Sequence, residues 1–408
     1  MGASSRRTAR AGPQFYQKQR DQNKTHTNPS AVAVAGGLEG GYNPPMDLPI
    51  IELAGSPRAM GEAFGEGCRR EARELYAVRM GHALAFAADH GKTLGEADVL
   101  AVCRECLGPT RDYDPQGWEE FAGIARGAGL TPEQCYALQG LTDLRDVLAF
   151  GRPDAEGCSS FMVAADRAAD GRMLLGQTWD LQTDNMPYIR LVHRRPVDQP
   201  ETWSLTLTGC LTLIGINAEG VAVGNTNLMT ADARVGVQYL TVLHRALRAR
   251  SLAEAVLCIG DAPRAGAHYY YAGGPDGTAV GLECSAARQA TFEVAAGTFA
   301  HCNHALDPSI AALEVQPPTP SSRHRQQRLS DLLDSHPGPI GVEDITGYLS
   351  DHTGGADRCI CRHDHDGVST NAAVILSPAT REIHACRAQP HVGAWLTRQA
   401  GVGGPGSP

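Results

Sequence analysis

The chain has 408 residues, of which 42% are hydrophobic and 20% are charged, and its net charge at pH 7 is −9. This composition is typical of a globular protein with a large core, and the scattered lysines and arginines form no basic patch for nucleic acid or an anionic membrane. No apolar run approaches the roughly 18 residues that a transmembrane helix needs.

The first 45 residues are rich in glycine, serine, asparagine and glutamine, which predicts a disordered tail over 1–45. Their arginines are not followed by the apolar stretch of a secretory signal, so we expect none. The 12 cysteines lack the spacing of a small disulfide scaffold. We therefore expect reduced thiols and a cytoplasmic protein.

The chain changes character near residue 157. Over 50–148 apolar residues recur every three or four positions, which predicts helices throughout. Thr131 with Gln134 three residues later is typical of a helix start. A polar break follows at 152–154, and from Cys158 onward the pattern favours strands and turns.

The second part alternates hairpins with helices. The expected elements are a hairpin over 159–181, three strands over 203–229, helices over 236–260, a hairpin over 267–286, a helix over 321–336 and a final hairpin over 369–388. Antiparallel hairpins interrupted by paired helices predict an α+β body in which helices flank stacked sheets.

Gly157 and Cys158 lie where the pattern changes. One interpretation makes Cys158 a small buried residue. The other makes the bond before it a cleavage site, because glycine allows the backbone conformations that a strained scissile peptide needs. Attack of the Cys158 thiol on the Gly157 carbonyl would leave Cys158 as an N-terminus, whose amine can take the thiol proton.

Several motifs occur together in order. They are IIELAGSPRAMGEAFGE, EGCSSFMV, GQTWDL, IGINAEGVAVGNTNL, HCNH, SSRHRQQRL and CICR. With them the sequence resembles the penicillin acyltransferase (isopenicillin-N N-acyltransferase) family of self-processing cysteine Ntn hydrolases, and more distantly bile-salt and penicillin V hydrolases. The resemblance implies a four-layer αββα sandwich with a helical N-terminal segment, autocleavage before Cys158, and Cys158 as the nucleophile.

The resemblance also implies roles for residues on the return strand of the first hairpin. Asp180, 22 residues after Cys158, would be the carboxylate that positions the Cys158 amine. Gln177 and Trp179 on the same strand would contact substrate or act in maturation. Without the resemblance, Asp180 reads as a turn residue at a strand end.

Two asparagines are candidates for holding an oxyanion, since an amide donates hydrogen bonds without carrying charge. Asn303 in HCNH matches the family, and Asn227 matches through the bile-salt hydrolases, with Asn225 as the fallback. The competing interpretation for each is ordinary turn chemistry at a strand end.

Arginines are candidates for substrate binding or maturation. Ser322, Arg325 and Arg328 are spaced three apart on an expected helix, so they can share a face. The family has a Ser-Arg pair where this chain has Ser369-Thr370, so the arginine's role is absent here or is filled by Arg362 or Arg325. Penicillin is therefore not carried over as the substrate.

One short segment has a cysteine or histidine at every second position, and these residue types can bind zinc. They are Cys359, Cys361, His363 and His365. On a strand all four would face one way, but residues two apart lie about 6.5–7 Å apart, too far to surround one ion without a tight bend. We expect a sheet segment running into a loop, and no metal.

The residues and the resemblance together predict an autoproteolytic N-terminal-cysteine amidohydrolase that acts on a small N-acyl or aminoacyl amide through an acyl-thioenzyme. Its α chain (46–157) and β chain (158–408) would form a heterodimer without a cofactor. The alternatives are an acyl-CoA-dependent N-acyltransferase of the same family, with acyl-CoA as donor, and a zinc-binding protein that never cleaves itself.

Overall fold

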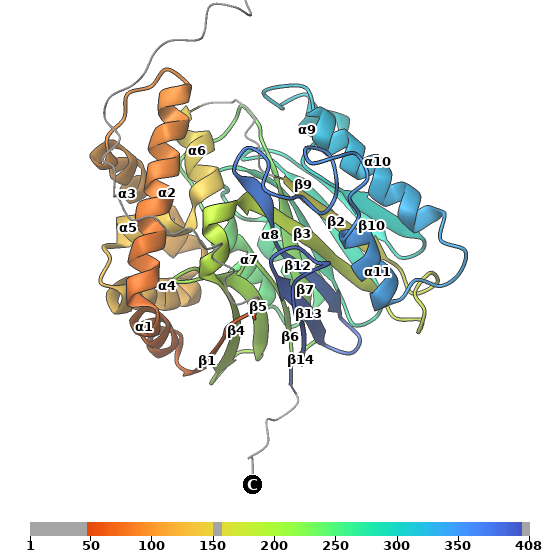
Figure 1. Cartoon of the computed structure of the whole chain (residues 1–408). Helices are drawn as coiled ribbons and strands as arrows, with labels where there is room; N and C mark the ends of the chain where they lie inside the picture. The colour runs from red at the N-terminus through yellow and green to blue at the C-terminus, as the bar shows by residue number, and fades with distance from the viewer. Residues whose placement is uncertain (1–46, 150–156, 402–408) are drawn as a thin grey trace, which may run out of the picture. The chain divides into compact units, whose positions relative to one another are not determined.

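The computed structural model describes residues 47–149 and 157–401. Residues 47–149 form one strand and six helices (Figure 1): β1 (Ile50–Gly55), α1 (Pro57–Gly67), α2 (Arg69–Asp89), α3 (Glu96–Tyr113), α4 (Pro115–Ala128), α5 (Pro132–Gln139) and α6 (Leu141–Ala149). The predicted start of α5 is confirmed, because Thr131 and Gln134 form a capping box there. The proposed tail over 1–45 and the residues just before Gly157 lie outside the described ranges.

The prediction of helix from residue 50 onward is wrong for β1. This strand pairs in parallel with β4 (Ile189–Pro196). Ile50 and Ile51 are β-branched and favour a strand, whereas the first helix begins only after Ser56 caps its N-terminus. The segment before the proposed cleavage site thus supplies an edge strand to a sheet built by the segment after it.

Two sheets follow from the strand pairing. The eight-stranded sheet has the order β1-β4-β5-β6-β7-β8-β9-β10, with β5 (Thr202–Leu207), β6 (Ile214–Asn217), β7 (Ala222–Leu228), β8 (Ala267–Gly273), β9 (Ala279–Cys284) and β10 (Gln289–Val294). The six-stranded sheet has the order β11-β2-β3-β12-β13-β14, with β11 (Thr298–His301), β2 (Gly157–Val163), β3 (Leu174–Gln182), β12 (Val368–Ser377), β13 (Glu382–Arg387) and β14 (Trp395–Gln399). Within the described ranges, only the β1–β4 pair is parallel.

Helices cover the outer face of each sheet. The helices α7 (Tyr239–Leu247) and α8 (Leu252–Gly260) pack on the eight-stranded sheet, and α10 (Pro320–Asp334) and α11 (Val342–Leu349) pack on the six-stranded sheet (Figure 1). A short helix α9 (Pro308–Ala311) and a 3-10 helix η1 (Thr183–Tyr188) lie in connections. The predicted αββα layering is confirmed.

Alternation along β2 explains how this strand serves two layers. Phe161 and Val163 pack with Leu329 and Leu333 beneath α10, whereas Met162 belongs to the larger core that contains the inter-sheet space. Because successive strand residues face opposite sides, Cys158 shares the side of Met162. The candidate nucleophile therefore faces the other sheet.

The helices α1 and α4 pack backbone against backbone. A Cβ atom added to Gly61 would lie 2.1 Å from the Glu120 carbonyl oxygen, and one added to Gly123 would lie 2.5 Å from the Arg58 carbonyl oxygen. Glycine is required at such contacts because any side chain would force the helices apart. The contact fixes α4 and places Glu120 within reach of β4.

The C-terminal part contains one strand more than the predicted final hairpin. The strands β12 and β13 pair as expected, but β14 then adds a further antiparallel strand over Trp395–Gln399. The first hairpin turns at Gly171, whose φ of 69° is one that glycine adopts readily. This turn brings β3 back beside Cys158.

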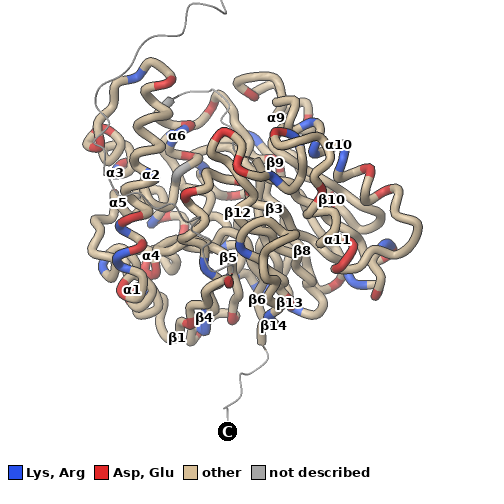
Figure 2. The backbone as a smooth tube through the Cα atoms, in the orientation of Figure 1, with Lys and Arg blue, Asp and Glu red and all other residues tan. Residues whose placement is uncertain are grey.

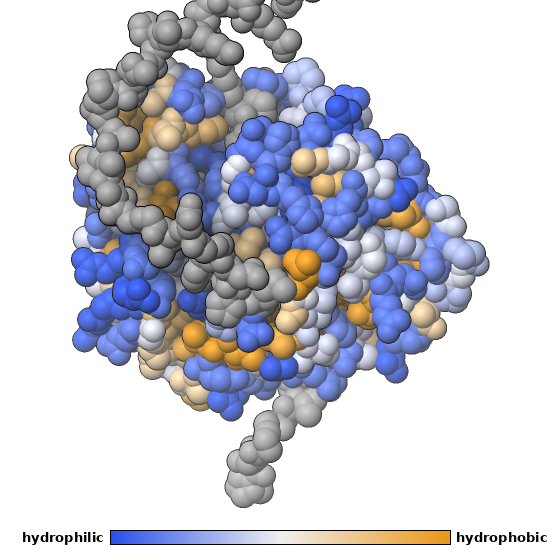
Figure 3. Space-filling view, in the orientation of Figure 1, coloured by the Kyte–Doolittle hydropathy of each residue, from blue (hydrophilic) through white to orange (hydrophobic). Residues whose placement is uncertain are grey.

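The surface carries mixed charge. Basic and acidic residues are interspersed along the backbone (Figure 2), and the face seen in Figure 3 is mainly hydrophilic with small apolar areas. None of the helices within 47–149 and 157–401 combines the length and apolar character needed to cross a bilayer.

Candidate active site

Cys158 lies at the start of β2 with its side chain buried. In the pairing of β2 with β3, Cys158 is opposite Trp179 and Gly157 is opposite Asp180. The predicted proximity of Asp180 to the Gly157–Cys158 bond is thus confirmed. Both residues of that bond line one narrow cavity between the sheets.

Asn303 holds the backbone nitrogen of Cys158. Its Oδ1 accepts a hydrogen bond from the Cys158 N–H at 2.8 Å and another from Arg325 Nη2 at 2.9 Å. Because both partners can only donate, the atom facing them must be the amide oxygen. Asn303 Nδ2 donates to the Asn227 carbonyl oxygen at 3.0 Å. In the uncut chain, the amide group expected to hold an oxyanion is therefore engaged elsewhere.

Arg325 reaches from α10 into the centre of the site, where its side chain is buried. Besides Asn303, its guanidinium donates to the Cys158 carbonyl oxygen and to Ser159 Oγ, the latter at 3.0 Å. A planar guanidinium can serve several acceptors at fixed angles, which an ammonium cannot. Arg325 thus ties α10 to both ends of the Cys158 residue.

Ser322, one turn earlier on α10, supports the loop that carries Asn303. Its Oγ accepts the Asn303 N–H at 2.9 Å and lies 2.8 Å from His304 Nδ1. Burial lowers the pKa of His304 to about 4, and the neighbouring charges of His301 and Arg323 act in the same direction. His304 is therefore neutral at pH 7 and can accept the Ser322 hydroxyl proton.

Asp180 is buried beside two arginines. Burial raises the pKa of this carboxyl, while Arg325 and Arg362 oppose the rise. Its Oδ1 accepts a hydrogen bond from Thr370 Oγ1 at 2.7 Å, and its Oδ2 has no hydrogen-bond partner among the described residues. One carboxylate oxygen thus remains available at the cavity.

Gly157 is crowded by the same two guanidinium groups. A Cβ atom added to Gly157 would lie 3.0 Å from Arg325 Nη2 and 3.2 Å from Arg362 Nη1. The absence of a side chain lets both cations approach the carbon skeleton of the candidate scissile bond. Close packing against the two arginines therefore favours glycine at position 157, whatever the backbone conformation there.

The sequence matches the family described as Acyl-coenzyme A:6-aminopenicillanic acid acyl-transferase over residues 167–391, just over half of the chain. The chain belongs to this family. Similar solved structures include a mutant conjugated bile acid hydrolase from Clostridium perfringens, at 9% identity and a TM-score of 0.39 over 59% of this chain and 92% of that one. Another is penicillin V acylase from Agrobacterium tumefaciens, at 12% identity and a TM-score of 0.37 over 56% and 82%. No curated protein matches the chain.

Membership confirms the resemblance inferred from the motifs. It identifies the chain as an enzyme acting on carbon–nitrogen amide bonds. The matched range begins after Cys158, so it contains Asp180, Asn303 and Arg325 but not the candidate nucleophile itself.

Thr370 stands where the resemblance expects an arginine. Its hydroxyl accepts the Arg362 N–H at 2.8 Å and donates to Asp180. Arg362 and Arg325, the two residues considered as replacements, both lie beside Gly157. Two arginines from other positions are thus present beside Gly157.

Arg328 is not part of the site. Ser322 and Arg325 are buried, whereas the part-exposed Arg328 forms an ion pair at 2.6 Å with Asp351 in the loop after α11. The prediction that all three share one face is therefore wrong for Arg328. A spacing of six residues exceeds one turn and a half, so the third residue rotates away from the first.

Gln177 and Trp179 are two residues apart on β3 and so lie on the same face of the strand. Gln177 Oε1 accepts the Asn225 N–H at 3.1 Å and so joins the two sheets, while Trp179 lines the cavity. Asn227 also lines the cavity, and its side-chain oxygen has no partner among the described residues. Asn225, the fallback to Asn227, has its amide nitrogen 3.0 Å from His268 Nδ1.

The cavity wall contains His268, which forms a buried pair with Asp143 that no sequence motif predicts. His268 Nε2 lies 2.8 Å from Asp143 Oδ1, and the other Asp143 oxygen accepts the Tyr239 N–H at 2.7 Å. The His268 ring is thus held between Asn225 at Nδ1 and Asp143 at Nε2. Asp143 is on a helix and His268 on a strand 125 residues later, so no local motif joins them.

The cavity is small in the uncut chain. Its volume is about 20 Å³, which is room for a single water molecule. It is lined by Arg79, Thr142, Gly157, Cys158, Trp179, Asp180, Leu181, Leu213, Asn225, Asn227, Tyr239, His268 and Asn303.

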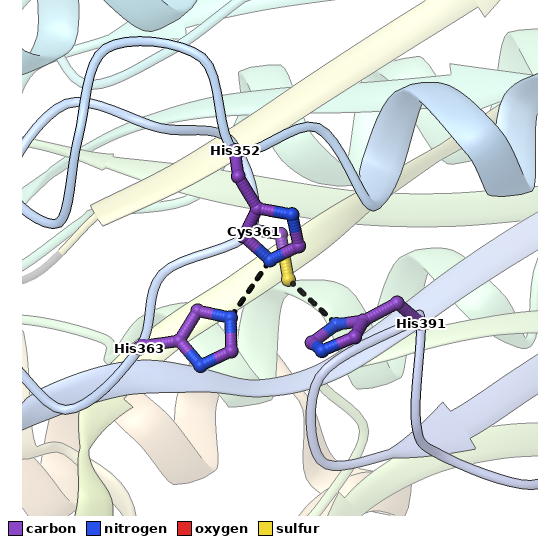
Figure 4. Close-up of side chains that lie close together, drawn as sticks. All are labelled: His352, Cys361, His363 and His391. Carbon is purple, nitrogen blue, oxygen red and sulfur yellow. Dashed lines mark hydrogen bonds between the residues drawn. The ribbon is translucent and has the colours of Figure 1, made fainter.

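The four ligands considered for zinc do not come together as a set. The chain over 359–365 is an irregular loop rather than a strand, so the expectation of a sheet segment is wrong. Cys359 Sγ donates to the Cys361 carbonyl oxygen at 2.9 Å, and His365 lies beside Asp366. Cys361 and His363 instead lie close to His352 and His391, which come from other loops (Figure 4).

Proposed function

We propose that the chain cuts itself between Gly157 and Cys158 and then uses Cys158 as an N-terminal nucleophile to hydrolyse a small N-acyl or aminoacyl amide. The observation that carries this proposal is the hydrogen bond from the Cys158 N–H to Asn303 Oδ1 at 2.8 Å. This hydrogen bond would hold the nitrogen in place when cleavage converts it from an amide into a free amine.

In the proposed cleavage, Cys158 Sγ attacks the Gly157 carbonyl carbon. The carbon–sulfur bond forms, the carbon–nitrogen bond breaks, and the nitrogen leaves as the Cys158 amine after taking the thiol proton. Water then hydrolyses the thioester and releases a Gly157 carboxylate. The guanidinium groups of Arg325 and Arg362, which flank Gly157, would stabilise the negative charge that develops on its carbonyl oxygen.

In the mature enzyme, the Cys158 amine would act as the base for its own thiol. An α-amine has a pKa near 7.7–8.0, so a useful fraction is neutral at pH 7. Asn303 Oδ1 would still accept a hydrogen bond from this nitrogen, and Asp180 would offer its unpaired oxygen. The thiolate would then attack the substrate carbonyl and form an acyl-thioenzyme, which water resolves.

The two products of the cut would remain together as a heterodimer of 46–157 and 158–408. Glu120 on the first side forms a buried ion pair with Arg194 on the second, at 2.7 Å. The pairing of β1 with β4 and the bond from Tyr239 N–H to Asp143 also cross the division. Separation would expose all of these groups, so we expect the chains to stay associated.

A second candidate function is acyl transfer to an amine. It is favoured by the family description, which names acyl-coenzyme A as a substrate. An acyltransferase must keep water from the thioester and hold an amine in its place. The two functions share Cys158 and differ in the acyl donor, an amide or acyl-CoA, and in the acceptor, water or an amine.

The test of cleavage is denaturing intact-mass measurement of the wild type, Cys158→Ala and Cys302→Ala. We expect two fragments meeting at 157/158 in the wild type and one uncut chain in Cys158→Ala. Cys302 is a matched control, because its buried Sγ lies 3.7 Å from Ser159 Oγ in the same region. An uncut wild type that is fully active would overturn the proposal.

The acceptor is tested on the mature enzyme with N-acyl amines, aminoacyl amides and acyl-CoA, each with and without a free amine. Release of carboxylate from amides, without dependence on the amine, is the expected result. Product formation only from acyl-CoA with an amine would instead establish the acyltransferase.

A further inference from the structure

Three loops bring four metal-ligand side chains to one place (Figure 4). His352 follows α11, Cys361 and His363 lie before β12, and His391 lies between β13 and β14. Their ligand atoms all lie within 4.8 Å of one another. His352 Nε2 and His363 Nε2 are 2.7 Å apart, and Cys361 Sγ is 3.5 Å from His391 Nδ1. Figure 4 shows the three rings and the sulfur directed toward a common point.

The dimensions suit a tetrahedral ion. Bonds of about 2.0–2.1 Å to nitrogen and 2.3 Å to sulfur place neighbouring ligand atoms about 3.3–3.6 Å apart. The observed separations lie on both sides of that range, so shifts of about 1 Å in side chains complete the geometry. The three histidines are exposed and can make such shifts, while buried Cys361 supplies a fixed anchor.

The donor set suits an ion of the zinc class. Three imidazole rings and one cysteine sulfur are ligand types that zinc takes in closed protein sites.

We propose that His352, Cys361, His363 and His391 bind one divalent transition-metal ion of the zinc class in a closed, structural site. On binding, the Cys361 thiol loses its proton to solvent and its sulfur becomes a metal-bound thiolate. Imidazole and thiolate donors select zinc-like ions over magnesium or calcium, and four protein ligands leave no open position for catalysis. This site goes beyond the amide chemistry and does not depend on autocleavage.

The ion would fix the loop that carries Arg362. Cys361 and His363 hold this loop on both sides of Arg362, whose backbone N–H is already bonded to Thr370. His352 and His391 would tie the same loop to two others. A structural metal would therefore stabilise the wall of the active site next to Gly157.

The test measures metal content in the full-length chain, both wild type and Cys158→Ala, after chelation and dialysis against Zn²⁺. We expect one bound ion per chain in both proteins, which separates this proposal from cleavage. Co²⁺ substitution should give a thiolate-to-cobalt charge-transfer band. Zinc should also raise the melting temperature.

The variants Cys361→Ser and His391→Ala should bind zinc roughly 100-fold more weakly, since even outer-sphere changes cost 10–100-fold. Cys359→Ser and His365→Ala are matched controls, because these residues lie in the same loop but outside the cluster, and they should retain the ion. Circular dichroism verifies folding, and His391→Ala, at an exposed position, guards against misfolding of the cysteine variant. Absence of tight zinc binding, no cobalt–thiolate band, or equal loss in the controls would overturn the proposal.

Discussion

Replacement of Arg325 by methionine tests the arrangement around Cys158 most directly. Methionine fills similar space but removes the donor for three acceptors, which are the Cys158 carbonyl, Ser159 Oγ and Asn303 Oδ1. A buried acceptor left without its donor costs about 1–3 kcal/mol. Because Asn303 Oδ1 keeps the Cys158 N–H and Ser159 Oγ keeps the Cys302 thiol, Arg325→Met should destabilise the fold by about 1–3 kcal/mol. Part of this cost is offset at Asp180, which can protonate once the cation is gone.

The comparison is made in the Cys158→Ala background, so that every variant is one uncut chain, and the free energy of unfolding is measured by denaturant titration. Arg328→Met is the matched control, since Arg328 lies on the same helix and pairs with Asp351 at a part-exposed position. Such pairs contribute about 0–1 kcal/mol. If Arg325→Met cost no more than Arg328→Met, the reasoning about the buried donors would be refuted.

With Cys158 intact, Arg325→Met should also slow the appearance of the two fragments. Removal of one preorganised donor from a developing oxyanion typically costs about 10²–10³-fold in rate. A time course of intact mass on freshly purified protein, at a denaturant concentration where the variant is folded, separates this effect from stability. Cleavage at the wild-type rate would contradict the role given to Arg325.

Two further predictions concern the fold around the site. Gly61→Ala should destabilise by about 1–3 kcal/mol, because its Cβ would lie 2.1 Å from the Glu120 carbonyl oxygen, whereas Gly67→Ala, with nothing within 4 Å, should be neutral or stabilising in the same thermal-denaturation series. The stability of the wild type should fall as the pH drops from about 6.5 to 4, since the unfolded chain binds a proton at His304 that the folded chain, with a pKa of about 4, resists. The loss attributable to His304 is at most about 3 kcal/mol, and His304→Gln should flatten that part of the curve; an unchanged slope would contradict the assignment.

The sequence predicted the local part of the site and the layers that carry it. Cys158 and Asp180 lie on one hairpin, whose turn is marked by Asp170-Gly171, so their proximity follows from short-range pairing. The helix that carries Arg325 was likewise predicted, from the helical spacing of residues over 321–336. Position along the chain and local pattern were sufficient there.

The sequence could not predict contacts made by distant elements. His268 and Asp143 meet only because α6 and β8 border the same cavity, and neither residue belongs to a motif. The metal ligands show the same limitation, because the alternation of Cys361 and His363 was visible but the loops that bring His352 and His391 were not. The strand β1 was missed because its short apolar run continues into the helical pattern of α1.

Polar side chains gather at the backbone of Cys158. Asn303 and Arg325 contact the nitrogen and the carbonyl oxygen, and Asp180 lies across the strand pair from Gly157. Under the proposed cleavage this nitrogen changes from an amide, which donates one hydrogen bond, to an amine, which can also take a proton. Asn303 Oδ1 can accept from both forms, so this hydrogen bond needs no rearrangement. The charge gained when the amine is protonated falls next to Asp180, whose buried carboxylate lacks one partner beforehand. The cut would therefore supply the cation that Asp180 is placed to receive, and the site would be completed by its own first reaction.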